Sequence, residues 1–248
     1  MTPLILLRVA LAAAFLAGCT SAPGEAIVPH GRLASRPQKT ADACAPGERR
    51  LVLSSGPDAH LYIPAAAASR TSVPLLVFLH GAGGSADQTI EYMRPIADEY
   101  GFVLLVPGSV GRTWDGIREK PEVDAARIDE ALRVAFESCP VDRRRLAIGG
   151  FSDGASYALT IGLGNGDLFS HVIAFAPCGV SRDVKLIEGP RVFVSHGAQD
   201  DVLPIERCGR PIVAALKRKG YEVRFVEFQG KHEIPANVAA AAFAWFTK

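Results

Sequence analysis

Short apolar runs alternate with longer amphipathic stretches from about residue 49 to the end of the chain. The first two runs, residues 50–54 and 59–63, flank the turn sequence Ser55-Gly56-Pro57-Asp58 and therefore predict an antiparallel hairpin. Later runs of similar length, most of them rich in β-branched residues, are typical of buried parallel strands. They complete a set of eight predicted strands and cover residues 75–79, 102–106, 146–149, 172–175, 191–195 and 223–228.

Stretches with helical periodicity lie between these strands. They cover residues 87–100, 123–138, 152–163, 205–219 and 234–246. Strands that alternate with helices of this size predict the α/β class, with a mostly parallel eight-stranded sheet and helices on both faces. The interval between residues 175 and 191 is too short for a large lid domain, so we expect an open, shallow site.

The first residues of the chain have the pattern of a targeting segment rather than of a folded element. Residues 1–17 are almost wholly apolar, carry a single charge at Arg8, and lead into Gly18 and Cys19. The string Leu-Ala-Gly-Cys resembles the lipobox of bacterial lipoproteins, which implies a signal peptide over residues 1–18 and a lipid on Cys19. The alternative is an ordinary secretory peptide with an incidental cysteine. Both predict export, and the first predicts a lipid-anchored protein facing the periplasm or the cell exterior.

The segment that follows is rich in Pro, Ser, Ala and Gly and has no helical or strand periodicity. Residues 19–48 are therefore predicted as the lipidated cysteine and a flexible tether, and residues 49–248 as one folded catalytic domain. Composition agrees with a globular domain, because 48% of the residues are hydrophobic. The 27 Lys and Arg residues nearly balance the 26 Asp and Glu residues, which gives no indication of a nucleic-acid partner.

Four cysteines remain after Cys19, and four thiols allow three pairings. Cys178 and Cys208 follow consecutive predicted strands at the same sheet edge, so we predict one disulfide between them and a second between Cys44 and Cys139. Four unpaired thiols are the alternative. No Cys-x-x-Cys pair or histidine cluster indicates a metal site.

The motif Gly150-Phe151-Ser152-Asp153-Gly154 follows a predicted strand and opens a predicted helix. This is the context of a nucleophile elbow, in which a strained turn raises the serine hydroxyl above the sheet. Ser152 is therefore the predicted nucleophile, with a helix-capping serine as the alternative.

A serine hydroxyl needs a base to act as a nucleophile at neutral pH. His232 follows the last predicted strand and precedes the last helix, so it fits the chain order Ser, Asp or Glu, His. The acid that orients it lies between the two, and both Asp200 and Asp201 qualify. We favour Asp200, because adjacent loop side chains point in different directions and only one can face His232.

Two backbone amides are expected to stabilise the negative oxygen that forms during acyl transfer. Asp153 follows the nucleophile, and Ala82 lies in the loop His80-Gly81-Ala82-Gly83-Gly84 after the third predicted strand. GxGxxG and a P-loop lysine are both absent, so no nucleotide or other cofactor is predicted.

The strings HGAGG, GFSDG, HGAQDDVLP and GKHEIP resemble the α/β-hydrolase superfamily in their order and spacing. The chain looks most like small bacterial serine esterases of the phospholipase/carboxylesterase group, near dienelactone-hydrolase-like and polyhydroxybutyrate-depolymerase or feruloyl-esterase-like proteins. The resemblance implies a triad of Ser152, Asp200 and His232 that hydrolyses carboxylic esters. A peptidase or acyltransferase on the same triad is the first alternative, and a non-catalytic binding lipoprotein is the second. Dienelactone hydrolases have a Cys nucleophile, and better-known members of the group are not lipoproteins.

The expected partners are a small-molecule or lipid-like ester and, through the lipid on Cys19, a membrane. Gly81, Gly83 and Trp114 are candidate pocket residues, and core packing is the alternative for Trp114. The triplet Arg143-Arg144-Arg145 precedes a predicted strand, so it is expected at the sheet edge opposite the site.

Overall fold

The computed structural model describes residues 30–37, 44–54, 58–117 and 121–248. The predicted signal peptide and Cys19 lie outside these residues. Among the described residues, no helix is both long enough and apolar enough to cross a membrane.

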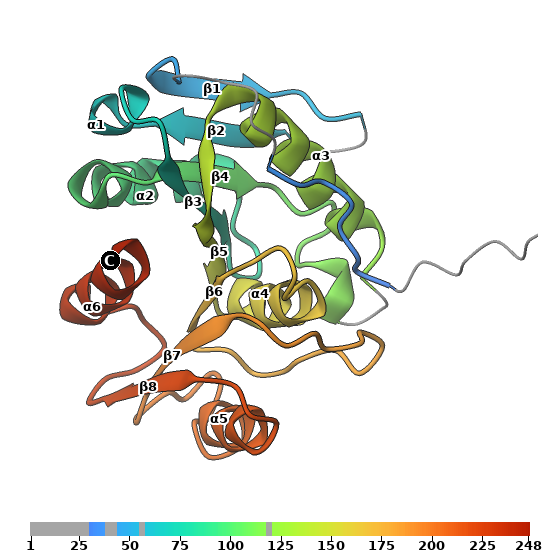
Figure 1. Ribbon diagram of the computed structural model, residues 1–248. Helices are drawn as coiled ribbons and strands as arrows, with labels where there is room; N and C mark the ends of the chain where they lie inside the picture. The colour runs from blue at the N-terminus through green and yellow to red at the C-terminus, as the bar shows by residue number, and fades with distance from the viewer. Residues whose placement is uncertain (1–29, 38–43, 55–57, 118–120) are drawn as a thin grey trace, which may run out of the picture.

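The sheet has eight strands in the order β1-β2-β4-β3-β5-β6-β7-β8 (Figure 1). Strands β3 to β8 are parallel, whereas β2 runs antiparallel to its neighbours β1 and β4. This confirms the predicted mostly parallel sheet, which is open at both edges. The strands are β1 (Gly47–Leu51), β2 (Ala59–Ile63), β3 (Val73–Leu79), β4 (Val103–Pro107), β5 (Val141–Phe151), β6 (His171–Phe175), β7 (Arg191–Gly197) and β8 (Val223–Phe228).

Helices cover both faces of the sheet, as predicted. Buried side chains of α3, α4 and α5 pack on one face, and buried side chains of α2 and α6 pack on the other. The loop of residues 176–190 joins β6 directly to β7, so no lid domain lies there. The helices are α1 (Ala65–Ala68), α2 (Ala86–Tyr100), α3 (Val123–Ser138), α4 (Asp153–Gly164), α5 (Gly209–Arg218) and α6 (Ala236–Thr247), with a short 3₁₀ helix η1 (Asp115–Ile117).

The first strand lies earlier in the chain than the hydropathy pattern predicts. It covers Gly47–Leu51 instead of residues 50–54. The cause is a contact outside the hairpin: the amide and the hydroxyl of Ser54 hydrogen-bond to the carboxylate of Glu130 on α3. The chain therefore turns away from β2 after Leu51.

The structure also differs from the predicted tether, because residues 30–37 pack on the folded domain. Leu33 is buried, and its amide donates to the side chain of Asn165. Arg32 donates two hydrogen bonds to the carboxylate of Asp167 and one to the carbonyl of Gly164. These contacts add an ordered segment to the domain before residue 49.

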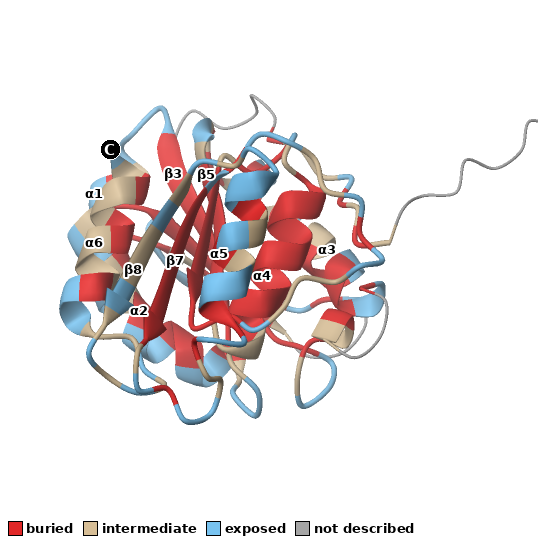
Figure 2. Ribbon diagram, turned by 90° about the horizontal axis from the view of Figure 1, so that it is seen from below, coloured by how far each residue is buried: buried red, intermediate tan, exposed pale blue. Residues whose placement is uncertain are grey.

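Helix α4 carries the predicted nucleophile at its start and is buried along almost its whole length (Figure 2). The loop of residues 176–190 covers it through hydrogen bonds from Ser181 to Thr160 and from Ile187 to Leu163. Helix α5, in contrast, exposes its outer face. Ser152 therefore lies at the start of a firmly packed helix.

Candidate active site

Ser152 lies in a sharp turn between β5 and α4. Its backbone angles are φ 58° and ψ −121°, a region that residues other than glycine rarely adopt. The turn is held by a hydrogen bond of 2.9 Å from the Ser152 amide to the carbonyl of Phe175 on β6. This is the strand, turn and helix arrangement that the motif predicts, and it presents the serine hydroxyl at the carboxyl end of the sheet.

The glycines on either side of Ser152 are required by close packing. A Cβ atom at Gly150 would lie 2.6 Å from the backbone of Gly154 and 2.7 Å from the carbonyl oxygen of Leu79. A Cβ atom at Gly154 would overlap the carbonyl oxygens of Leu79 and His80. Only glycine lets the start of α4 approach β3 and the loop after it this closely.

His232 reaches Ser152 from the loop between β8 and α6. Its Nε2 atom lies 2.9 Å from Oγ of Ser152. The ring of Phe151 packs against the imidazole, with 4.7 Å between ring centroids. Phe151 also packs against the hydrophobic core, and its position directly before the serine is the only sequence signal for its contact with His232.

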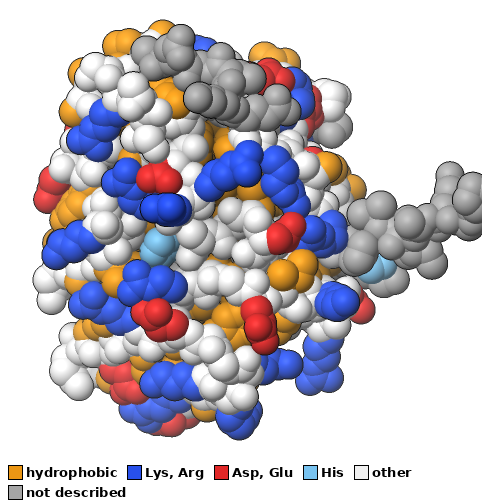
Figure 3. Space-filling view, viewed as in Figure 1, with side chains coloured by type: hydrophobic (Ala, Val, Ile, Leu, Met, Phe, Trp, Pro, Cys, Tyr) orange, Lys and Arg blue, Asp and Glu red, His pale blue; other side chains and the backbone are white. Residues whose placement is uncertain are grey.

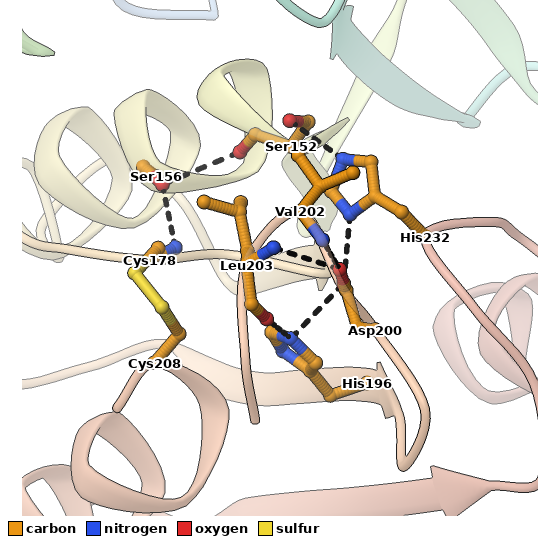
Figure 4. Close-up of a disulfide and its surroundings, with 9 residues drawn as sticks. All are labelled: Ser152, Ser156, Cys178, His196, Asp200, Val202, Leu203, Cys208 and His232. Carbon is orange, nitrogen blue, oxygen red and sulfur yellow. Dashed lines mark hydrogen bonds and ion pairs between the residues drawn. A yellow bond between two sulfur atoms is a disulfide. The ribbon is translucent and has the colours of Figure 1, made fainter. Parts of the chain in front are cut away.

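Of the two candidate acids in the loop after β7, Asp200 points toward His232 (Figure 4). Oδ2 of Asp200 lies 2.7 Å from Nδ1 of His232, and the Asp200 side chain is fully buried. The Asp201 side chain is 67% exposed and pairs with Lys231 at 3.5 Å. Asp200 is therefore the carboxylate that faces the histidine.

Hydrogen bonds keep the carboxyl group of Asp200 ionised. Burial alone would raise its pKa, but hydrogen bonds from the Leu203 amide, from His232 and from the Val202 amide outweigh burial and lower the pKa below its usual value. The amides of Val202 and Leu203 donate to Oδ1 at 3.0 and 2.7 Å, so Oδ2 stays directed at His232.

His196 is a second histidine beside Asp200. Its fully buried ring places Nε2 2.7 Å from the carbonyl oxygen of Leu203 and 3.3 Å from Oδ2 of Asp200. Gly209 allows α5 to begin against this ring, since a Cβ atom there would lie 2.7 Å from Nδ1. The imidazole thus supports the loop that carries Asp200.

The glycine-rich loop after β3 lies next to Ser152. A Cβ atom at Gly81 would be 3.4 Å from Cβ of Ser152, which shows how close the loop approaches. Neither the Ala82 amide nor the Asp153 amide donates a hydrogen bond to another residue in the part of the chain that the structure describes. Both candidate oxyanion donors are therefore open to a ligand.

His80 and Trp114 fix the shape of this loop. Nδ1 of His80 donates to the carbonyl of Gly81 at 2.8 Å, and Nε2 accepts from the Ser109 amide at 3.2 Å. Burial lowers the pKa of His80, which favours this neutral form. The indole N–H of Trp114 donates to the carbonyl oxygen of His80 at 2.9 Å.

Trp114 belongs to the core, which was the alternative to its predicted pocket role. Its side chain is 1% exposed and stacks on Tyr157 with 5.3 Å between ring centroids. The segment that carries it does border a cavity of about 440 Å³, together with Ala82 and Asp153. Trp114 therefore forms the base of this cavity, while its neighbours 110–113 form the exposed wall.

Two disulfide bonds join the cysteine pairs that the sequence predicts, Cys44 with Cys139 and Cys178 with Cys208. The second lies beside the candidate site, where the Cys178 amide donates to Oγ of Ser156 at 2.8 Å (Figure 4). Disulfides are typical of proteins in an oxidising, extracytoplasmic compartment. Among the described residues, no group of three or more His, Cys, Asp or Glu side chains is arranged to hold a metal ion.

The arginine triplet lies at the end of the sheet opposite Ser152, where the parallel strands begin. Arg143, Arg144 and Arg145 lie there in β5 and border a cavity of about 720 Å³ with His171 and Trp245. Lys and Arg side chains are numerous on this face (Figure 3). The triplet therefore lies away from Ser152, as predicted.

No protein-family model matches the chain, and no curated protein matches its sequence. Solved structures do match. An S-formylglutathione hydrolase from Agrobacterium tumefaciens is 18% identical with a TM-score of 0.63, and the match covers 84% of this chain and 96% of that one. A ferulic acid esterase from Anaeromyces mucronatus is 16% identical with a TM-score of 0.61, covering 85% and 92%.

A phospholipase/carboxylesterase from Dyadobacter fermentans is 21% identical with a TM-score of 0.58, and the match covers 83% of this chain and 98% of that one. Together with the strand order, these similarities show that the chain has the α/β-hydrolase fold, as the sequence resemblance implies.

Proposed function

We propose that the chain is a serine hydrolase that cleaves carboxylic esters, with Ser152 as nucleophile, His232 as general base and Asp200 as the acid that orients it. The observation that carries the proposal is the continuous chain of contacts from Ser152 Oγ to His232 Nε2 at 2.9 Å and from His232 Nδ1 to Asp200 Oδ2 at 2.7 Å. The structural neighbours, an S-formylglutathione hydrolase and a ferulic acid esterase among them, support this reaction class.

The contacts of Asp200 determine which nitrogen of His232 carries the proton in the resting enzyme. The ionised carboxylate accepts a hydrogen bond from Nδ1–H, so Nε2 is left with its lone pair toward the serine hydroxyl. Ser152 Oγ then donates to Nε2. This arrangement prepares the hydroxyl to lose its proton as it attacks.

In the first half of the reaction, Ser152 Oγ bonds to the ester carbonyl carbon while its proton moves to Nε2 of His232. The electron pair of the carbonyl bond moves to oxygen, and the amides of Ala82 and Asp153 stabilise the negative charge. When the carbonyl re-forms, the bond to the alcohol breaks, and His232 gives its proton to the departing alkoxide.

In the second half, His232 takes a proton from water as the water oxygen attacks the acyl group on Ser152. The tetrahedral intermediate again places its charge on the two amides, and the bond to Ser152 breaks. The carboxylic acid leaves and the serine recovers its proton from His232. Asp200 remains ionised throughout and stabilises the imidazolium each time it forms.

Hydrolysis of p-nitrophenyl esters from acetate to long acyl chains tests the proposal. We expect hydrolysis by the purified protein and a loss of roughly three orders of magnitude or more in Ser152→Ala. Amide substrates and alcohol acceptors, assayed in parallel, separate esterase from peptidase and acyltransferase activity. A folded protein that hydrolyses none of the esters, or a Ser152→Ala variant that keeps its activity, contradicts the proposal.

We also propose that the protein is exported and anchored to a membrane by a lipid on Cys19. The Leu-Ala-Gly-Cys string supports the anchor, and the two disulfides support an extracytoplasmic location. Mass spectrometry of the mature N-terminus tests this. We expect an acylated Cys19 as the first residue, and an unmodified cysteine would contradict the anchor.

A further inference from the structure

The cavity of about 440 Å³ beside the candidate site contains both candidate oxyanion donors in its wall. Ala82 and Asp153 line it together with residues 110–115. The cavity thus offers space for one arm of a substrate whose carbonyl oxygen accepts from these two amides. The side chains in its wall decide which arms are accepted.

Arg112 is the one cationic side chain among the residues that line this cavity. It is exposed, and no salt bridge or side-chain hydrogen bond ties it to any residue in the described ranges. Its guanidinium lies alongside Gly83, where a Cβ atom would be 3.8 Å from both Nε and Nη2. The charge is thus next to the glycine-rich loop and has no ion-pair partner within the described ranges.

The three acidic side chains that line this cavity already accept hydrogen bonds from neighbouring residues. Asp124 accepts from the amides of Val110 and Asp115, both at 2.9 Å. Asp115 caps the start of α3, accepting amide hydrogen bonds from residues 122–124, and also accepts from the hydroxyl of Tyr157.

Asp153, the third carboxylate, lies in the first turn of α4, where the helix dipole favours negative charge. It accepts a hydrogen bond of 2.7 Å from the hydroxyl of Thr113. The three acidic groups therefore already accept hydrogen bonds, whereas the side chain of Arg112 has no partner among the described residues.

Two hydrogen bonds hold the backbone around Arg112, one at its own carbonyl oxygen and one at the next residue. Its carbonyl oxygen accepts a 2.7 Å hydrogen bond from the Gly83 amide, which follows the first oxyanion donor. The next residue, Thr113, hydrogen-bonds to Asp153, which carries the second. The backbone that holds the guanidinium is therefore tied to both halves of the oxyanion site.

We infer that Arg112 binds a carboxylate of the substrate, so that the preferred substrates are esters with a second, ionised carboxyl group on the arm that enters this cavity. A guanidinium offers two parallel N–H donors to a carboxylate, and charge-assisted bonds of this kind are stronger than neutral ones. The inference rests on the proposed ester hydrolysis and names its substrate class.

Paired substrates that differ only in the carboxylate test the inference. Mono-p-nitrophenyl adipate against p-nitrophenyl hexanoate places the charge on the acyl arm, and 4-acetoxybenzoate against phenyl acetate places it on the alcohol arm. The variants are Arg112→Gln, Arg112→Lys, and the control Arg218→Gln. Arg218 is exposed in the last turn of α5, shortly before β8 begins at the far edge of the sheet.

In one of the two pairs, we expect Arg112→Gln to lower kcat/KM for the anionic ester by about tenfold or more while the neutral ester changes little. Arg112→Lys keeps the charge but not the paired donors and is expected to recover part of the loss. Arg218→Gln is expected to resemble the wild type with all four substrates.

Equal losses on anionic and neutral esters, or no loss on either pair, would overturn the role of Arg112. Hydrolysis of the neutral esters in the wild type keeps this outcome distinct from failure of the proposed function. If the folded wild type hydrolyses no ester and Ser152 does not react, the proposed function itself fails, and the inference fails with it.

Discussion

Oδ2 of Asp200 lies 2.7 Å from Nδ1 of His232, while the adjacent Asp201 points to solvent. The two aspartates therefore form a matched pair for mutation, with the same charge and neighbouring positions in one loop. Asp200→Asn removes the acceptor that holds the proton on Nδ1, and we expect kcat to fall by roughly 10³- to 10⁴-fold. Asp201→Asn removes one exposed ion pair and is expected to change kcat by no more than about twofold. Steady-state kinetics on p-nitrophenyl acetate measure both, and equal effects would contradict the assignment of Asp200.

The tight packing around Gly150 predicts a loss of stability on substitution. In Gly150→Ala the new methyl group would lie within 2.7 Å of backbone atoms of Gly154 and Leu79. We expect the free energy of unfolding to fall by about 1–3 kcal/mol, because displacing these backbone atoms would strain the folded state. Gly179→Ala is the control, since a Cβ atom there meets no atom within 4 Å. Urea denaturation measures both variants, and a Gly150→Ala protein as stable as the control would contradict the packing argument.

The two disulfides are expected to have different effects on activity. Cys178 is linked to the proposed nucleophile through Ser156, whose hydroxyl donates to the carbonyl of Ser152 at 3.3 Å. Cys208 ends the loop of residues 198–208, which carries Asp200. Replacing Cys178 and Cys208 with serine is therefore expected to lower kcat as well as Tm.

The disulfide between Cys44 and Cys139 joins residues 95 apart in sequence, and Cys139 precedes the start of β5, whereas Ser152 follows its end. Removing this pair is expected to cost about 2–5 kcal/mol of stability and to leave kcat near the wild-type value at low temperature. Thermal unfolding and kinetics on both double variants check the contrast. An unchanged kcat without the Cys178–Cys208 bond would contradict its role in positioning the site.

His171 predicts how stability depends on pH. Burial, and after it the charge of Arg191, lowers the pKa of His171 from 6.5 to about 4. Between these values the unfolded chain binds the proton more readily than the folded one, so this group lowers the free energy of unfolding as pH falls from about 6.5 to about 4. We expect His171→Gln to lose less stability than the wild type across this range. Urea denaturation at several pH values measures it, and parallel pH profiles would contradict the prediction.

The sequence predicts the parts of the fold and site that depend on local pattern. Ser152 is identifiable because strand, glycines and helix are contiguous in the chain, and His232 because it follows the last strand. The choice between Asp200 and Asp201 depends on which side chain of a loop turns inward. The amides of Val202 and Leu203 hold the Asp200 side chain inward by hydrogen bonds to its carboxylate. The hydropathy pattern does not indicate these hydrogen bonds.

Two features lie beyond local pattern because their partners are distant in sequence. The first strand is displaced by the contact of Ser54 with Glu130, 76 residues away. The segment of residues 30–37 is held by contacts such as Arg32 with Asp167, 135 residues away. Its composition resembles that of a tether because side-chain hydrogen bonds, rather than a periodic apolar face, attach it.

The reactivity of Ser152 tests the central proposal most directly. A fluorophosphonate probe reacts with a serine that an adjacent base activates, and peptide mass spectrometry locates the adduct. We predict a single adduct on the peptide that contains Ser152 and none in Ser152→Ala. A folded wild-type protein that gives no adduct, or an adduct on another residue, would contradict the account.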